Sequence, residues 1–169
     1  MSVALLLVEC LDTARKLAVP VIHVGVARPL KAGLLDEPRT ATAIKSGKVP
    51  RQILPLAPGR TEGGFVLTPN ADEEVDYKIG VSAFAGTETL LRNLGNPDVI
   101  VAGVFTHMAV ESTVRHGFDL GFRLHVATPE CCAPTRALHE ASLSTGSPNF
   151  ARELADTAAV AEAMRTLKR

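Results

Sequence analysis

Hydrophobic positions change period several times along this chain, and each change marks an expected strand or helix. Residues 19–26 (VPVIHVGV) are mainly β-branched, which is typical of a parallel strand buried on both faces. Residues 99–104 (VIVAGV) and 123–127 (RLHVA) are expected to form strands as well. Residues 65–67 and 75–78 are candidates for two further short strands.

Apolar residues at helical spacing separate these strands. Leu7, Cys10 or Leu11, Ala14 and Leu17 form one stripe, which predicts a helix over residues 5–17. Further helices are expected at 86–94, at 107–120 and at 156–167, and residues 28–72 are expected to form a long loop with one short helix near 40–46. Because strands and helices alternate, the fold class is expected to be α/β, with three α-β-α layers around a central, mainly parallel sheet.

Composition excludes several classes of function. A length of 169 residues with 46% hydrophobic residues fits a single domain over residues 1–169. Eighteen basic and eighteen acidic side chains cancel, which argues against nucleic acid as a partner, and no apolar run is long enough to suggest a membrane. The three cysteines have neither disulfide-framework nor metal-ligand spacing, so we expect a cytoplasmic protein without a metal.

The segment from Val99 to Thr113 carries the clearest chemical signal. An apolar strand turns at Phe105 and Thr106 and continues at once as a helix. Such a junction directs unpaired backbone N–H groups into a crevice at the carboxyl end of a parallel sheet. A reactive residue would normally stand in the first helical turn, but this chain has Ala109 there.

Two motifs, KIGVSAFAGT at 78–87 and GVFTHMAVEST at 103–113, resemble the isochorismatase-like hydrolases, also called the cysteine hydrolase superfamily. The resemblance covers roughly residues 14–165 and implies a catalytic triad of Asp, Lys and Cys at the strand ends. The lysine corresponds to Lys78, and the cysteine position holds Ala109. The resemblance also implies a cis peptide between Val104 and Phe105 and an oxyanion hole from the N–H groups of Phe105 and Ala109. Thr106 and His107 belong to the same turn and are expected to contact substrate.

Two alignments of the chain's start are possible for the triad's acid. In one, residues 4–9 form the first strand and Glu9 replaces the Asp. In the other, residues 5–17 are a helix and the family's first strand would lie upstream of Met1. The helical stripe favours the second alignment, in which the domain lacks the acid as well as the thiol.

Two functions follow from the resemblance. The first is a hydrolase that acts on or binds a small molecule without a thiol nucleophile, as isochorismatases proper do when they cleave a vinyl ether with an acid and water. The alternative is a catalytically inactive member with a ligand-binding or assembly role. No cofactor is expected in either case. Relatives of this kind are commonly oligomers, so we expect a homo-oligomer.

Overall fold

The computed structural model describes residues 3–26, 67–78, 80–95 and 98–167. Its strands are β1 (Ile22–Val26), β2 (Glu74–Lys78), β3 (Asp98–Val104), β4 (Arg123–Cys132) and β5 (Glu153–Ala155). Its α-helices are α1 (Val3–Lys16), α3 (Phe84–Asn93), α4 (Glu111–Asp119), α5 (Arg136–Ala141) and α6 (Thr157–Leu167). A π-helical turn, Thr106–Val110, joins β3 to α4.

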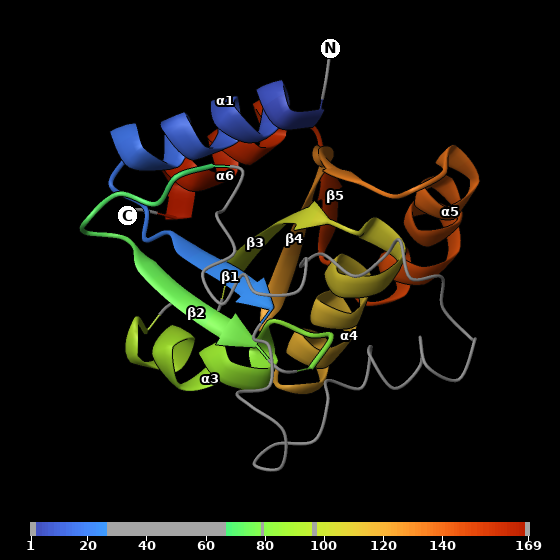
Figure 1. Cartoon of the computed structure of the whole chain (residues 1–169), viewed down its shortest axis with the longest axis horizontal. Coiled ribbons are helices and arrows are strands. Elements are labelled where there is room, and N and C mark those ends of the chain that lie inside the picture. The colour runs from blue at the N-terminus through green and yellow to red at the C-terminus, as the bar shows by residue number, and fades with distance from the viewer. Residues whose placement is uncertain (1–2, 27–66, 79, 96–97, 168–169) are drawn as a thin grey trace, which may run out of the picture.

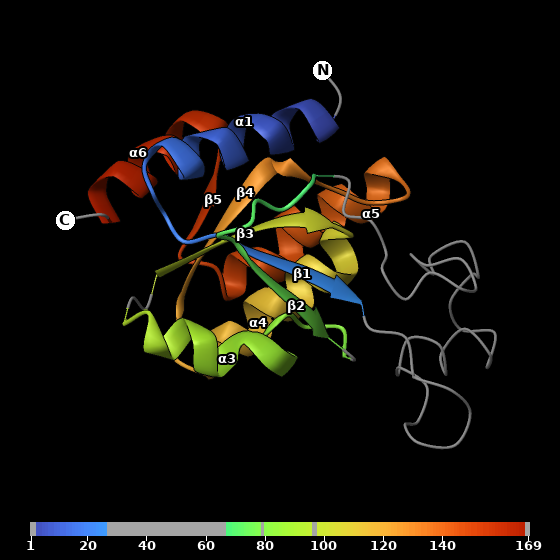
Figure 2. The same ribbon diagram turned by 60° about the vertical axis from the view of Figure 1, so that its left-hand side comes forward.

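All strand pairs are parallel, and helices cover both faces of the strands (Figure 1). Helices α1 and α6 lie side by side on one face, whereas α3 and α4 lie on the other (Figure 2). The α/β fold with parallel strands is therefore confirmed. The strands pair in two sets within the described residues, β1 with β2 and β3 with β4 and β5, rather than as one continuous sheet.

Strand β4 is the centre of the core because alternate side chains enter opposite layers. Leu124 and Val126 are fully buried in the cluster that holds Phe84 of α3 and Val114 of α4. Ala127 points to the other layer and packs with residues of α1, β5 and α6, namely Cys10, Ala14, Ala155, Val160 and Met164.

The structure decides the conformation of the first segment. Residues 3–16 are helical, so the helix expected at 5–17 is confirmed and the strand over residues 4–9 is wrong. The physical reason is that Cys10 and Ala14, which are one helical turn apart, form an apolar stripe. This stripe is buried against the layer that contains β4 and α6. Glu9 lies within α1 and does not close a strand.

Several of the other expected elements are found with shifted boundaries. The strand expected at 123–127 continues to Cys132, because pairing with β3 shifts after Val101 and resumes at Gly103 opposite Cys131. Pro129, which has no N–H to donate, lies in the stretch between these paired residues. The short helix expected near 40–46 lies outside the described residues, as does most of the strand expected at 65–67, and Leu67 is not in a strand.

Helices α3 and α4 approach closely at Gly117. A Cβ atom there would lie 2.5 Å from Cε2 of the buried Phe84 ring and 3.0 Å from Leu124 Cδ1. We predict that Gly117→Ala lowers the free energy of unfolding by about 1–3 kcal/mol, because the overpacking exceeds the gain in helix propensity. Urea denaturation measures this, with Asp119→Ala at the exposed end of α4 as the control expected to stay within about 0.5 kcal/mol of the wild type. An unchanged or raised stability of Gly117→Ala would contradict the packing described.

Candidate functional site

The turn after β3 has an unusual backbone. Gly103 has a φ of 123°, which favours glycine, and the Val104–Phe105 peptide bond is cis, as the resemblance implied. Phe105 is extended, and its carbonyl accepts hydrogen bonds from the N–H groups of Met108 (3.0 Å) and Val110 (3.2 Å). The chain thus passes from strand to helix within one residue, at the carboxyl edge of β3.

Lys78 is the last residue of β2 and is only 6% exposed. Its ammonium group donates a hydrogen bond to the carbonyl oxygen of Val81. Burial lowers the pKa of this side chain from 10.5 to about 8. A lysine buried at a strand end is uncommon in a purely structural role, since its charge must be desolvated.

Hydrogen bonds tie the segment after Lys78 to the turn after β3. The Thr113 hydroxyl donates to the carbonyl of Ala109 (2.7 Å) and accepts from the N–H of Ala83 (2.9 Å). One helical turn later, Nδ1 of His116 lies 3.1 Å from the Ser82 hydroxyl. These bonds bring the two motifs of the family resemblance side by side. That Lys78 and the turn line one pocket stays a prediction.

The position of the expected thiol holds Ala109, which is partly buried. The chain's cysteines lie elsewhere, and burial raises all three thiol pKa values: that of Cys10 to about 11, that of Cys131 to about 12, and that of Cys132 by a smaller amount. Cys132 pairs with Val104 in the register of β3 and β4, so of the three cysteines it lies nearest in the sheet to the turn after β3. A raised pKa keeps a thiol protonated at neutral pH, where it is a poor nucleophile.

A buried polar network, which the sequence patterns did not indicate, supports the turn after β3. Thr106 is fully buried, and its hydroxyl lies 2.9 Å from Nδ1 of His139. Ser142 donates to Oε2 of Glu111 at 2.6 Å and approaches the Thr106 carbonyl at 3.3 Å. The partners are 31 to 36 residues apart in sequence, so no local pattern could have indicated them.

That His107 contacts substrate stays a prediction. Its ring lies 6.2 Å from the Phe105 ring, and within the described residues its buried Nδ1 has no hydrogen-bond partner. In the same part of the chain, no three His, Cys, Asp or Glu side chains gather as a metal site would require. No described helix is long and apolar enough to cross a membrane.

Comparison with known proteins identifies the family. A model of the isochorismatase domain matches residues 5–159. This chain belongs to the isochorismatase family. Nicotinamidase 3 of Arabidopsis thaliana is 31% identical over 145 residues, which cover 83% of this chain and 69% of the plant protein. The uncharacterized isochorismatase family protein YecD of Escherichia coli O157:H7 is 38% identical over 72 residues, or 41% of this chain and 38% of that protein.

Solved structures of the isochorismatase family share the fold. A family protein from Desulfovibrio vulgaris has a TM-score of 0.75 at 22% identity, covering 98% of this chain and 85% of its own. A putative hydrolase of the family from Chromobacterium violaceum has a TM-score of 0.72 at 23% identity, covering 97% and 81%. Identities this low show the architecture alone, so the chemistry must be argued from the residues of this chain.

Replacing Lys78 tests whether its burial has the expected thermodynamic cost. A charged lysine with a pKa of about 8 in the native state costs on the order of 3 kcal/mol at neutral pH. We therefore predict that Lys78→Met raises the free energy of unfolding at pH 7 by about 1–3 kcal/mol. Lys16→Met, at the exposed end of α1, should change it by less than about 0.5 kcal/mol.

The lowered pKa of Lys78 also fixes how the stability difference between Lys78→Met and the wild type changes with pH. Between about pH 8 and pH 10.5 the unfolded chain holds the Lys78 proton that the native state has released, so raising the pH stabilises the native state. The advantage of Lys78→Met should therefore be full below pH 8 and should shrink as the pH approaches 10.5. Urea denaturation across this range measures it, and a difference independent of pH would contradict the lowered pKa.

Proposed function

We propose that this isochorismatase-family domain binds a small carbonyl- or carboxylate-bearing molecule at the carboxyl edge of its strands and has no thiol nucleophile of its own. The observation that carries the proposal is the buried Lys78 ammonium on a segment hydrogen-bonded to the turn that holds Ala109. An ammonium group and helix N-terminal N–H groups both favour a ligand oxygen that carries negative charge.

The chemistry of the residues argues against turnover by the hydrolytic route that a thiol would provide. Ala109 has no reactive atom, and the pKa values of all three thiols are raised. Glu9, the candidate acid of the less favoured alignment, lies in α1. Without a thiol at position 109 or an acid from Glu9 at the end of a strand, positioned N–H groups alone supply only a small part of an enzyme's usual acceleration.

The experiment that tests the proposal pairs binding with turnover. Nicotinamide is the first probe, because the Arabidopsis relative is named a nicotinamidase and an amide carbonyl suits the donors described. We expect saturable binding that is lost in Lys78→Ala and kept in Lys16→Ala, with no release of ammonia. Hydrolysis of nicotinamide or another small amide by the purified protein, abolished by Lys78→Ala, would show instead that the domain is an active hydrolase.

Introducing the missing thiol tests the electrostatics of the turn. We predict that Ala109→Cys creates a thiol with a pKa below the ordinary value of about 8.5, since the helix N-terminus and the Lys78 cation both stabilise a thiolate. Asp119→Cys, at the exposed opposite end of α4, is the matched control and should have a pKa of about 8.5 or higher.

Iodoacetamide alkylation across pH, with the modified residue located by mass spectrometry, measures both pKa values. The wild type supplies the background of the native thiols. Adding Lys78→Met to Ala109→Cys should raise the pKa of the new thiol. Equal pKa values for the thiols at positions 109 and 119 would mean that the turn has no capacity to stabilise an anion.

We also propose that the domain is a cytoplasmic homo-oligomer. Its three cysteines are free thiols, which suits a reducing compartment. Within the described residues, β1 and β3 each pair on one side only, and Val104 and Phe118 are 54% and 51% exposed. Strand edges and exposed apolar side chains are surfaces that association covers.

Sedimentation velocity at micromolar concentration measures the association state. We predict a dimer or larger closed assembly, because a symmetric contact can cover the same patch on both subunits at once. A single species with the mass of one chain, 17.9 kDa, over the whole concentration range would contradict the prediction.

A further inference from the structure

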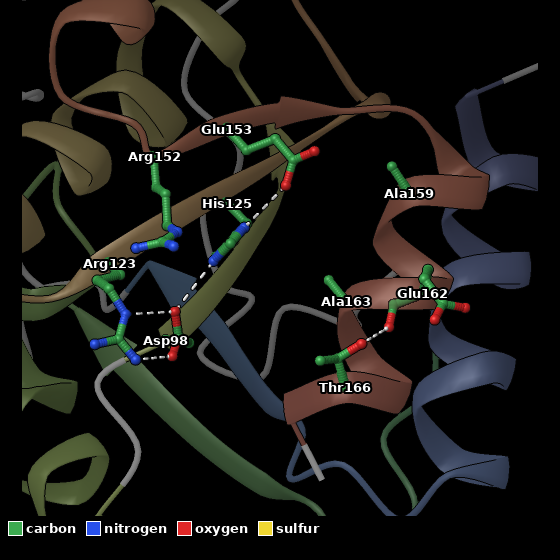
Figure 3. Close-up of a pocket in the computed structure, with 9 residues that line it drawn as sticks. All are labelled: Asp98, Arg123, His125, Arg152, Glu153, Ala159, Glu162, Ala163 and Thr166. Atoms are coloured by element: carbon green, nitrogen blue, oxygen red, sulfur yellow. Dashed lines mark hydrogen bonds and ion pairs between the residues drawn. The ribbon is translucent and has the colours of Figure 1, made fainter. Parts of the chain in front are cut away.

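A cavity of about 550 Å³ lies at the opposite edge of the strands from the candidate site (Figure 3). Asp98 opens β3, Arg123 and His125 lie at the start of β4, and Glu153 opens β5. Because these strands are parallel, their first residues share the amino edge of the sheet, whereas the turn after β3 lies at the carboxyl edge. The cavity is therefore separate from the site described above.

Asp98 anchors the charges of this cavity. Its carboxylate is 4% exposed and accepts hydrogen bonds from Nε of Arg123, at 2.8 Å, and from Nη2 of the same guanidinium. The hydrogen bond from Arg123 is the main cause of a lowered Asp98 pKa, so the carboxylate is ionised at neutral pH. The pair leaves Nη1 of Arg123 without a hydrogen-bond partner among the described residues, and its side chain is 48% exposed.

The other carboxylates around the cavity also have basic partners. Glu153 lies 3.4 Å from Nδ1 of His125, whose Nε2 faces Asp98 at 3.2 Å. Glu162 of α6 pairs with Arg165 at 3.1 Å, and in Figure 3 its carboxylate points away from the cavity. Each acidic side chain that borders the cavity therefore has a nearby cationic or imidazole group.

Arg152 has no ion-pair partner among the described residues. In the described part of the chain no carboxylate oxygen lies within 4.0 Å of its guanidinium, and Figure 3 shows the side chain directed toward Arg123 and His125. Its backbone N–H is fixed by a 2.8 Å hydrogen bond to the Leu124 carbonyl, so the side chain starts from a defined point. Across the cavity, α6 presents the small side chains of Ala159 and Ala163, which leave room for a ligand between α6 and the strands.

We propose that this cavity binds a small molecule through an oxyanion group, a carboxylate or a phosphate, held by Arg152 and by Nη1 of Arg123. A guanidinium presents paired N–H donors that match the spacing of carboxylate and phosphate oxygens. A volume of about 550 Å³ lies in the usual range for metabolite-sized ligands. The proposal depends on none of the chemistry proposed for the carboxyl edge.

The test uses the wild-type protein and two matched variants, followed by nuclear magnetic resonance. Inorganic phosphate and succinate are titrated separately while the Arg152 Nε–H signal and the methyl signals of Ala159 and Ala163 are recorded. Arg152→Gln removes the charge at an exposed position and is expected to fold normally. Arg136→Gln, on α5 and 88% exposed, removes the same charge far from the cavity.

We expect saturable shifts of these signals with at least one of the two anions, about tenfold weaker binding in Arg152→Gln and unchanged binding in Arg136→Gln. The anion that binds identifies the group that the cavity recognises. The proposal is overturned if neither anion saturates the signals, or if Arg152→Gln binds as the wild type does. An equal loss in both variants would also overturn it, because the effect would then come from net charge.

Discussion

The hydroxyl of Thr113 holds the candidate site together. It is buried, donates to the Ala109 carbonyl at 2.7 Å and accepts from the Ala83 N–H at 2.9 Å. One side chain thus joins the helix after β3 to the segment that follows Lys78. An unpaired buried N–H costs about 1–3 kcal/mol, so separating the two motifs would leave the Ala83 N–H without its partner, whereas the Thr113 hydroxyl would keep its bond to Ala109.

Near this link the protein buries a charged group, Lys78, that its apolar core does not need for stability. β4 and the helices on both of its faces form a well-buried apolar interior, in which Leu124 and Val126 are fully enclosed. Lys78 is nearly as buried, and desolvation lowers its pKa to about 8. A group whose burial destabilises the fold is most simply explained by a ligand that needs it, and this supports a binding role even without a nucleophile at position 109.

Local patterns predicted the elements of the fold but not the contacts between them. The stripe that contains Cys10 and Ala14 indicated α1, and the apolar run before Phe105 indicated β3, because each depends on neighbours a few residues away. The strand expected to end at Ala127 continues to Cys132 because β3 supplies a second set of partners beyond Pro129. The bond between Thr106 and His139 spans 33 residues, and the short helix that carries His139 has no periodic signal. The division of the strands into two sets was also not predicted, since pairing depends on which edges meet in space.

The methyl signal of Ala109 tests most directly whether the Lys78 amine and Ala109 face the same site. In protein labelled with ¹³C at alanine methyl groups, that signal should shift with pH through an apparent pKa of about 8, as the neighbouring amine loses its proton. In Lys78→Met the shift should disappear, while Lys16→Met should leave it unchanged. A methyl signal that does not respond near pH 8, or that responds equally in Lys78→Met, would contradict the shared site.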